Sequence, residues 1–235
     1  MPPSTCRLHP WSGKPVKALL FDLDGTLVDS APDIATAINT VLTSQGLEAL
    51  DVSVVRSLIG EGIRRLTEKA FAVRGVALSG DALDSNTASF AANYATCIAD
   101  QTVPFLGVVE SLQHFKEAGF KLAVVSNKAQ HLTEHLMSQI GLVKFFDHIQ
   151  GAVSSLAPKP APDMLLATLA QLGTAPQESL FIGDSSIDLA AGNAAGLPVV
   201  LLEGGYTAGS PLPKGAAHVT YGFHALARWI DGVDV

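Results

Sequence analysis

Two pairs of aspartates are the residues of this 235-residue sequence whose type and spacing most favour chemistry. Asp22 and Asp24 stand two residues apart in the run Asp-Leu-Asp-Gly-Thr, and Asp184 and Asp188 stand four apart. Side chains four residues apart share one face of a helix, so the second pair is expected to point in one direction. Gathered into one site, the four carboxylates would repel one another unless a cation offset their charge. Oxygen ligands of this kind favour Mg²⁺.

Ordinary local structure is the alternative for each pair taken alone. Asp184 could cap a helix, and Asp22 with Asp24 could begin a turn. Neither alternative explains why both pairs directly follow strongly apolar segments. If the apolar segments are strands of one sheet, the aspartates that follow them form a site; if they are not, the local alternatives hold.

Three short runs of the sequence are continuously apolar, as strands buried on both faces are. They cover residues 18–21, 122–125 and 180–183. The polar residues that follow them are Asp22, Ser126 and Asp184. Helical patterns lie between the runs, and further strands are expected at residues 199–202 and 218–220. Strands that alternate with helices predict an α/β fold, with a doubly wound parallel sheet of Rossmann-like type. Ligands bind such a sheet at the carboxyl ends of its strands, so the three polar residues are expected in one crevice.

The segment from residue 31 to residue 103 interrupts this alternation. It indicates successive helices, which we expect at residues 31–45, 52–59, 63–71 and 81–100. We therefore predict an all-helical domain, residues 31–103, inserted into an α/β core made of residues 16–30 and 104–235. Residues 1–15 contain four prolines and are expected to be loosely ordered.

Composition excludes several classes of partner. The formal net charge is −7 and the isoelectric point is near 5.4, which argues against binding nucleic acid or an anionic membrane. No run approaches the ~20 apolar residues of a membrane span, and the N-terminus lacks the apolar region of a signal peptide. We expect a cytoplasmic protein, either a monomer or a homodimer.

Four ordered motifs resemble those of the haloacid dehalogenase superfamily. The first, written DxDGT, begins at Asp22; the second contains Ser126 and Asn127; the third is Lys159 followed by Pro160. The fourth covers residues 183–188 and contains both Asp184 and Asp188. The helical insertion between the first two motifs corresponds to the C1 cap of that superfamily.

The resemblance implies a role for each motif residue. Asp22 would attack phosphorus and form an aspartyl phosphate, while Asp24 would act as general acid and then general base. Lys159 and Ser126, with Asn127 beside it, would bind the phosphoryl oxygens. Mg²⁺ would be held by Asp22, by the backbone carbonyl of Asp24, by Asp184 and, directly or through a water, by Asp188. Without the motifs, Ser126 would be an ordinary strand-end hydroxyl and Lys159 a surface lysine.

The second aspartate also selects a branch of the superfamily. Its dehalogenases lack a carboxylate at the position of Asp24 and its phosphonate hydrolases replace it, so a phosphate monoester is the favoured substrate. Its β-phosphoglucomutase branch typically has a histidine in the first cap helix, and residues 31–43 contain none. A small phosphorylated metabolite is therefore the expected partner.

Within the phosphatases, residues 21–33 and 58–65 resemble bacterial phosphoglycolate phosphatases. Gly60 would let the backbone approach the ligand, and Arg64 or Arg65 could bind a substrate carboxylate. Alternatively, both arginines lie on an exposed helix face. The sequence after Tyr206 departs from the ending typical of that family, so a sugar phosphate or a biosynthetic intermediate remains an alternative substrate. A phosphomutase is less expected. A non-catalytic binding protein is least expected, because no motif residue is missing.

Overall fold

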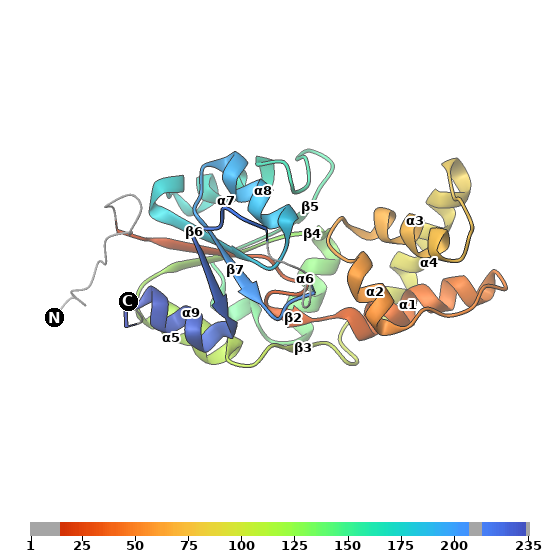
Figure 1. The fold of residues 1–235 in the computed structure, drawn as a ribbon, viewed down its shortest axis with the longest axis horizontal. Coiled ribbons are helices and arrows are strands. Elements are labelled where there is room, and N and C mark those ends of the chain that lie inside the picture. Colours follow the sequence, from red (N-terminus) through yellow and green to blue (C-terminus); the bar gives the residue numbers. More distant parts are fainter. Residues whose placement is uncertain (1–14, 207–212, 234–235) are drawn as a thin grey trace.

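The computed structural model describes residues 15–206 and 213–233 (Figure 1). Nearly all of the N-terminal segment that we expected to be loosely ordered lies outside the described residues. Six parallel strands form one sheet in the order β5-β4-β1-β6-β7-β8, which confirms the predicted doubly wound fold. Their bounds are Ala18–Phe21 for β1, Lys121–Ala129 for β4, His148–Ala152 for β5, Ser179–Gly183 for β6, Val199–Glu203 for β7 and His218–Tyr221 for β8.

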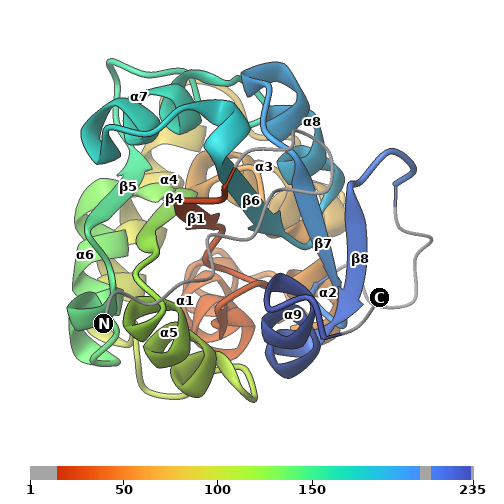
Figure 2. The same ribbon diagram turned by 90° about the vertical axis from the view of Figure 1, so that its left-hand side faces the viewer.

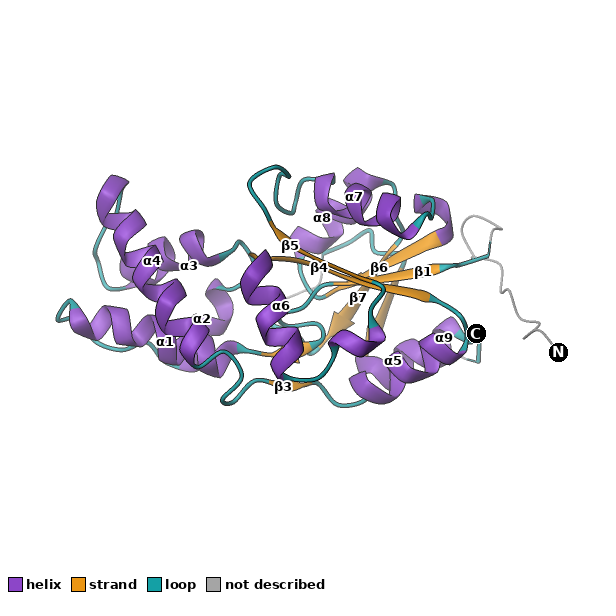
Figure 3. Ribbon diagram, turned by 180° about the vertical axis from the view of Figure 1, so that it is seen from behind, coloured by secondary structure: helices purple, strands orange, loops and turns teal. Residues whose placement is uncertain are grey.

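Helices cover both faces of this sheet (Figures 2 and 3). One face is covered by α5 (Val108–Glu117), α6 (Gln130–Gln139) and α9 (Gly222–Ile230); the other by α7 (Asp163–Leu172) and α8 (Ser186–Ala195). Short 3-10 helices lie at Val143–Phe145 and Pro176–Glu178. Successive side chains of a strand point to opposite faces, so both faces of a central strand must be apolar.

The first strand illustrates this arrangement. Leu19 and Phe21 belong to the cluster under α5, α6 and α9, and Ala18 and Leu20 to the cluster under α7 and α8. All four side chains are fully buried. Phe21 also stacks on Phe115 and Phe223, which anchors the strand directly before Asp22. The strand end that positions Asp22 is therefore held firmly from both faces.

Four helices lie beyond the carboxyl ends of the central strands and are called the cap below (Figure 1). They are α1 (Ala31–Ser44), α2 (Val52–Leu58), α3 (Ile63–Val73) and α4 (Gly80–Thr96), close to the expected helices. A short antiparallel ribbon, β2 (Val28–Asp29) with β3 (Val103–Pro104), joins the cap to the sheet. In the described residues, no helix is long and apolar enough to cross a membrane.

The two connections to the cap are also joined by a buried carboxylate. Asp33, in the first turn of α1, accepts hydrogen bonds from the backbone N–H groups of Gln101 and Thr102 and from the Thr102 hydroxyl. The Asp33 side chain is fully buried, so these bonds compensate the loss of its hydration. The chain leaves and re-enters the sheet region at one fixed place.

Candidate active site

The first two aspartates occupy a tight turn after the central strand. The backbone N–H of Asp22 donates to the carbonyl of Ile182 in β6 at 2.9 Å, so the strand pairing continues up to the site. Gly25 turns the chain with a φ of 92°, and a Cβ there would lie 2.7 Å from the carboxylate of Asp184. Leu23 is fully buried, which leaves its neighbours Asp22 and Asp24 on the side of the crevice. Glycine is therefore required where the two halves of the site approach each other.

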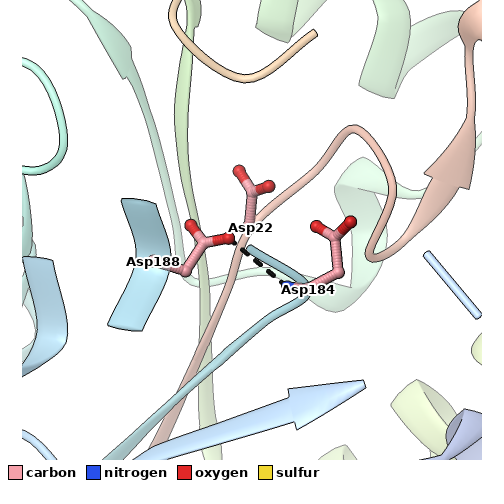
Figure 4. Close-up of side chains that lie close together, drawn as sticks. All are labelled: Asp22, Asp184 and Asp188. Atoms are coloured by element: carbon pink, nitrogen blue, oxygen red, sulfur yellow. Dashed lines mark hydrogen bonds between the residues drawn. The ribbon is translucent and has the colours of Figure 1, made fainter. Parts of the chain in front are cut away.

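Three buried carboxylates converge beside this turn. Asp22, Asp184 and Asp188 each place an oxygen within 4.8 Å of the others (Figure 4). Burial raises the pKa of Asp22 well above its usual value; the Lys159 ammonium opposes this rise, and the charges of Asp188 and Asp184 add to it. Burial, followed by the charge of Asp188, raises the pKa of Asp184 to about 7. A hard divalent cation bound to the three carboxylates would offset their mutual repulsion and their burial. Because such ions prefer oxygen ligands, the three aspartates fit a site of this kind.

Lys159 supplies positive charge directly beside the three carboxylates. Its Nζ donates to Asp22 Oδ1 at 2.6 Å and to Asp188 Oδ1 at 2.7 Å, and its side chain is 2% exposed. Burial alone would lower the pKa of Lys159, but the charges of Asp188 and Asp22 outweigh burial and raise it. The ammonium is therefore charged and lies beside Asp22. A phosphoryl group attached to Asp22 would meet it directly.

The first turn of α8 fixes Asp188. Its Oδ2 accepts hydrogen bonds from the backbone N–H groups of Asp184 and Ser185 and from the Ser185 hydroxyl, while the Ser185 hydroxyl accepts from the N–H of Asp188. This capping box holds the carboxylate in place at the helix N-terminus. Asp184 and Asp188 come to one site with Asp22, but not by the helical spacing that the sequence suggested. Asp184 precedes the N-cap Ser185 and lies outside α8, and the turn between β6 and α8 brings it beside Asp188.

Asn127 joins three segments of the chain. Its Nδ2 donates to the carbonyls of Gly60 in the cap and of Lys159, and its Oδ1 accepts from the N–H of Lys159. Protein groups thus occupy its amide, although the motif had suggested contact with substrate. Its neighbour Ser126 is buried at the end of the apolar run of β4, where its Oγ accepts from the N–H of Lys128. Gly60 adopts a φ of 128°, so its backbone can approach Asn127 in a conformation that other residues rarely adopt.

Asp24 turns away from the carboxylate cluster. Its Oδ1 accepts hydrogen bonds from the Ser30 hydroxyl and from Lys128 Nζ, the latter at 2.8 Å. Lys128 Nζ also donates to the Tyr94 hydroxyl of α4 at 2.6 Å. The Asp24 side chain therefore faces the cap, as a group that exchanges a proton with the leaving alcohol would need to do.

A tyrosine from beyond β7 connects the cluster to the start of the cap. The N–H of Tyr206 donates to Asp184 Oδ2 at 2.8 Å. Its hydroxyl accepts from the N–H groups of Ser30 and Ala31 and donates to Asp29 Oδ1. Arg56 of α2 pairs with Asp29 Oδ2 at 2.8 Å and lies over the Tyr206 ring. Tyr206 thus fixes Asp184 relative to the first cap helix.

Two cavities meet at Asp22 and Asp24. The polar cavity is also lined by Arg56, Ser57, Ile59, Gly60, Lys159, Asp184, Ser185, Asp188 and Tyr206. The apolar cavity lies under the cap and is also lined by Ile34, Ile59, Gly60, Gly62, Ile63, Leu66, Phe90, Tyr94, Ser126, Asn127, Lys128, Ala129 and Leu132. A phosphate ester bound at Asp22 could therefore place its charged end in one cavity and its carbon end in the other.

Comparison with known proteins identifies the family. The sequence profile described as haloacid dehalogenase-like hydrolase matches residues 19–202, most of the chain. The chain belongs to this family. A phosphoglycolate phosphatase of Caulobacter vibrioides is 38% identical over 216 residues, which cover 92% of this chain and 90% of that protein. A phosphoglycolate phosphatase of Thiobacillus denitrificans is 36% identical, covering 85% of this chain and 88% of that protein.

Solved structures agree with this assignment. A predicted phosphoglycolate phosphatase from Haemophilus somnus superposes with a TM-score of 0.82 at 28% identity, covering 93% of this chain and 98% of that one. CbbY from Rhodobacter sphaeroides in complex with phosphate has a TM-score of 0.77 at 22% identity, covering 90% and 96% of the two chains. The second similarity concerns the fold alone. This haloacid dehalogenase-like hydrolase is a phosphoric monoester hydrolase.

In this hydrolase Arg64 and Arg65 lie away from both cavities. Arg64 pairs with Asp84 of α4, and Arg65 pairs with Glu61 and Glu68. Both side chains are more than half exposed. The reason is that α3 is amphipathic. Its buried face consists of Leu66, Thr67, Ala70 and Phe71, and the two arginines lie outside that face. The structure does not bring either arginine to a position where it could bind a substrate carboxylate, and it favours the alternative of an exposed face.

Sequence reasoning missed four residues that the hydrolase places around the site. They are Arg56, Tyr94, Lys128 and Tyr206. Lys128 directly follows Ser126 and Asn127 in the second motif, so its position near a strand end was an available signal. No local pattern marked Tyr94 or Tyr206, because their contacts depend on how the cap and the segment after β7 fold back over the sheet.

Proposed function

We propose that this protein hydrolyses phosphoglycolate or a closely similar small phosphate monoester, using Mg²⁺ and a phosphorylated Asp22. The observation that carries the proposal is the position of Asp22, which lines both cavities and contacts the charged Lys159 ammonium. A carboxylate there can reach a phosphorus atom whose oxygens face the polar cavity and whose ester group faces the apolar one. The names of the relatives support phosphoglycolate as the first substrate to test.

The reaction is proposed to proceed in two displacements at phosphorus. In the first, an oxygen of Asp22 forms a bond to phosphorus while the bond to the ester oxygen breaks, and Asp24 gives its proton to the departing alkoxide. In the second, Asp24 takes a proton from a water that attacks the phosphorus of the aspartyl phosphate. The bond to Asp22 then breaks, which releases inorganic phosphate and restores the carboxylate.

The surrounding residues are proposed to bind the phosphoryl group. Lys159 pairs with the phosphoryl oxygens in the polar cavity. Ser126, on the wall of the apolar cavity at the end of β4, binds with nearby backbone N–H groups the phosphoryl oxygen at the junction of the two cavities. Asp22, Asp184 and Asp188 would hold the Mg²⁺, with the backbone carbonyl of Asp24 as a further ligand. The ion would offset charge on the phosphoryl oxygens. Asn127 positions Lys159 through both sides of its amide.

The apolar cavity favours a small leaving group. Its volume is about 50 Å³, which is small beside the roughly 300–1,000 Å³ of sites that bind drug-sized ligands. A two-carbon acid such as glycolate fits that space better than a sugar does. The cap would also exclude water from the ester during the first displacement.

A phosphate-release assay over many phosphate monoesters, each with Mg²⁺ and with excess EDTA, tests the proposal. We expect phosphoglycolate to give the highest kcat/KM and EDTA to remove the activity. A sugar phosphate preferred by tenfold or more over phosphoglycolate would overturn the proposed substrate. Full activity in EDTA would overturn the metal site.

A further inference from the structure

Lys128 and Tyr94 form a buried pair between the sheet and the cap, to which the proposed reaction gives no role. The Lys128 side chain is 6% exposed, and Tyr94 of α4 is 2% exposed. Lys128 Nζ donates to the Tyr94 hydroxyl and lies 4.6 Å from the centre of its ring. Its other partner is Asp24 Oδ1. Lys128 and Asp24 form an ion pair at 2.8 Å, which gives the ammonium a carboxylate partner in this buried place.

Both members of the pair have a hydrogen-bond donor to spare. An ammonium has three N–H donors, and within the described residues Lys128 uses two. The Tyr94 hydroxyl accepts from Lys128, and no described residue accepts its proton in return. Burial raises the pKa of Tyr94 to about 12, so the hydroxyl remains a donor. Because an unmade hydrogen bond in a buried site is costly, two spare donors side by side indicate a ligand with two acceptor atoms.

The apolar cavity, which both residues line, contains little else that could bind a charged ligand. Its cap side consists mainly of apolar residues: Ile34, Ile59, Ile63, Leu66 and Phe90. Among the described residues that line it, the charged side chains are the carboxylates of Asp22 and Asp24 and the ammonium of Lys128. An anionic group on the leaving alcohol would be repelled by the carboxylate of Asp22. Lys128 is the cation available to pair with it.

We propose that Lys128 and Tyr94 bind a carboxylate on the leaving alcohol, so that the enzyme selects phosphate esters of small 2-hydroxy acids. This inference rests on the proposed function, which places the phosphoryl group at Asp22 and the leaving oxygen at Asp24. In such an ester the carboxylate is bonded to the carbon that bears the leaving oxygen, so the two groups are close. Lys128 Nζ is 2.8 Å from Asp24 Oδ1, which suits that short separation. The spare N–H and O–H would each bind one carboxylate oxygen.

The test compares phosphoglycolate with ethyl phosphate, which has the same two-carbon length but no carboxylate. The kcat/KM of both is measured for the wild type, Lys128→Met, Tyr94→Phe and the control Lys144→Met, which removes a lysine that lines neither cavity. We expect Lys128→Met to reduce the ratio of phosphoglycolate to ethyl phosphate kcat/KM by about 10- to 150-fold. Tyr94→Phe should reduce the ratio by about tenfold or more, mainly through the KM of phosphoglycolate, since the hydrogen bond that it removes is made to a charged carboxylate. Lys144→Met should leave the ratio unchanged.

A role confined to positioning Asp24 predicts a different result. Both substrates would then lose kcat/KM equally in Lys128→Met and the ratio would stay constant, which would overturn the inference. If Lys128→Met does not fold, as judged by circular dichroism and thermal unfolding, Tyr94→Phe decides. That variant keeps the ammonium and its bond to Asp24, so an unchanged ratio there also overturns the inference.

Binding separates this inference from the proposed function. In an Asp22→Asn background with Mg²⁺, calorimetry measures the affinity for phosphoglycolate and for ethyl phosphate. Tighter binding of phosphoglycolate that is lost on adding Tyr94→Phe or Lys128→Met supports the pair, even if the wild type hydrolyses phosphoglycolate slowly and the proposed substrate fails. Equal affinity for the two compounds overturns the pair, even if wild-type phosphatase activity is high.

Discussion

The two cavities that meet at Asp22 and Asp24 are built in opposite ways. In the polar cavity, protein groups already contact the charged side chains: Asp188 accepts four hydrogen bonds from three residues, and Lys159 donates to two carboxylates. In the apolar cavity the walls are mostly aliphatic and aromatic, and Lys128 with Tyr94 supplies the polar contacts nearest the cap. The polar cavity is held by a dense network of hydrogen bonds, whereas the cap side of the apolar cavity is mainly apolar apart from Tyr94.

This difference follows from what each end of a phosphate ester requires. The phosphoryl group is the same in every monoester, so its site can be built from fixed strand ends and a helix N-terminus. The leaving group differs from one ester to the next, so its site needs only a cavity of matching size and a few polar contacts. Apolar residues on cap helices can change without disturbing the carboxylate cluster. The difference therefore suggests that chemistry resides in the core and selection in the cap.

Replacement of the nucleophile should have the largest effect. Asp22→Asn keeps the shape of the side chain but removes the oxygen nucleophile, so we expect turnover to fall by more than about 100-fold for every substrate. Phosphoenzyme trapped by acid quenching should disappear, while circular dichroism should be unchanged. Because Asp22 lines both cavities, no ester should escape this loss. Turnover above a hundredth of wild type would refute the assignment of Asp22.

Removal of the metal should have a comparable effect on activity and a distinctive one on stability. Burial and the charge of Asp188 raise the pKa of Asp184 in the folded protein to about 7, above its ordinary value of 3.8. In EDTA the folded state therefore binds more protons than the unfolded state between about pH 4 and 7, and stability falls as pH rises through that window. Mg²⁺ requires the ionised carboxylates, so it should stabilise the protein more at pH 8 than at pH 5.

Thermal unfolding with EDTA or with Mg²⁺ at the two pH values measures this effect. Asp184→Ala should abolish the stabilisation by Mg²⁺, because it removes a ligand, and should weaken the pH trend, because it removes one of the titrating groups. The raised pKa of Asp22 leaves a residual trend of the same sign. Asp163→Ala is a suitable control, since that aspartate begins α7 and lies outside the carboxylate cluster. An equal increase in Tm at both pH values would contradict the proposed cluster.

Loss of Asn127 should affect all substrates to the same extent. Asn127→Ala removes the bonds to Gly60 and to both backbone groups of Lys159, and leaving buried groups unpaired costs about 1–3 kcal/mol each. We expect lower stability in urea and a fall in kcat/KM of about tenfold or more for both phosphoglycolate and ethyl phosphate. The control is Asn86→Ala, which removes an exposed bond within α4. A loss confined to phosphoglycolate would indicate that Asn127 contacts the leaving group instead.

The sequence predicted the helices of the cap well, but it predicted the site residues of the core better than those of the cap, for a physical reason. Short apolar runs fix buried strands, and parallel strands bring their carboxyl ends to one edge, so the order of residues alone is enough to place Asp22, Ser126 and Asp184 together. Strand β5 was not predicted, because His148, Gln150 and Gly151 interrupt its apolar pattern at the edge of the sheet. The contacts of Tyr94 and Tyr206 arise between distant segments, and no local pattern encodes them.

The apolar periodicity of α3 already indicates that Arg64 and Arg65 are exposed. Ile63, Leu66, Ala70 and Phe71 recur at helical spacing, so residues directly after Ile63 should lie on the opposite face. A glycine-flanked turn near the motifs suggested a site, but periodicity within the helix determines which way each side chain points. In a helix of this kind, the direction of the apolar face is a stronger guide than proximity in sequence.

Removal of either arginine should therefore have the smallest effect. Arg64 and Arg65 form ion pairs that are exposed to solvent, and such pairs contribute about 0–1 kcal/mol. We expect Arg64→Ala and Arg65→Ala to change kcat/KM for phosphoglycolate by less than about twofold and urea stability by less than about 1 kcal/mol. Lys128→Met, assayed in parallel, is the positive control, since it should lose activity on phosphoglycolate selectively. A loss of tenfold on phosphoglycolate but not on ethyl phosphate would place an arginine in the leaving-group site after all. Because both arginines are bonded to acids on the outside of the cap, that outcome would require α3 to turn toward the cavity when substrate binds.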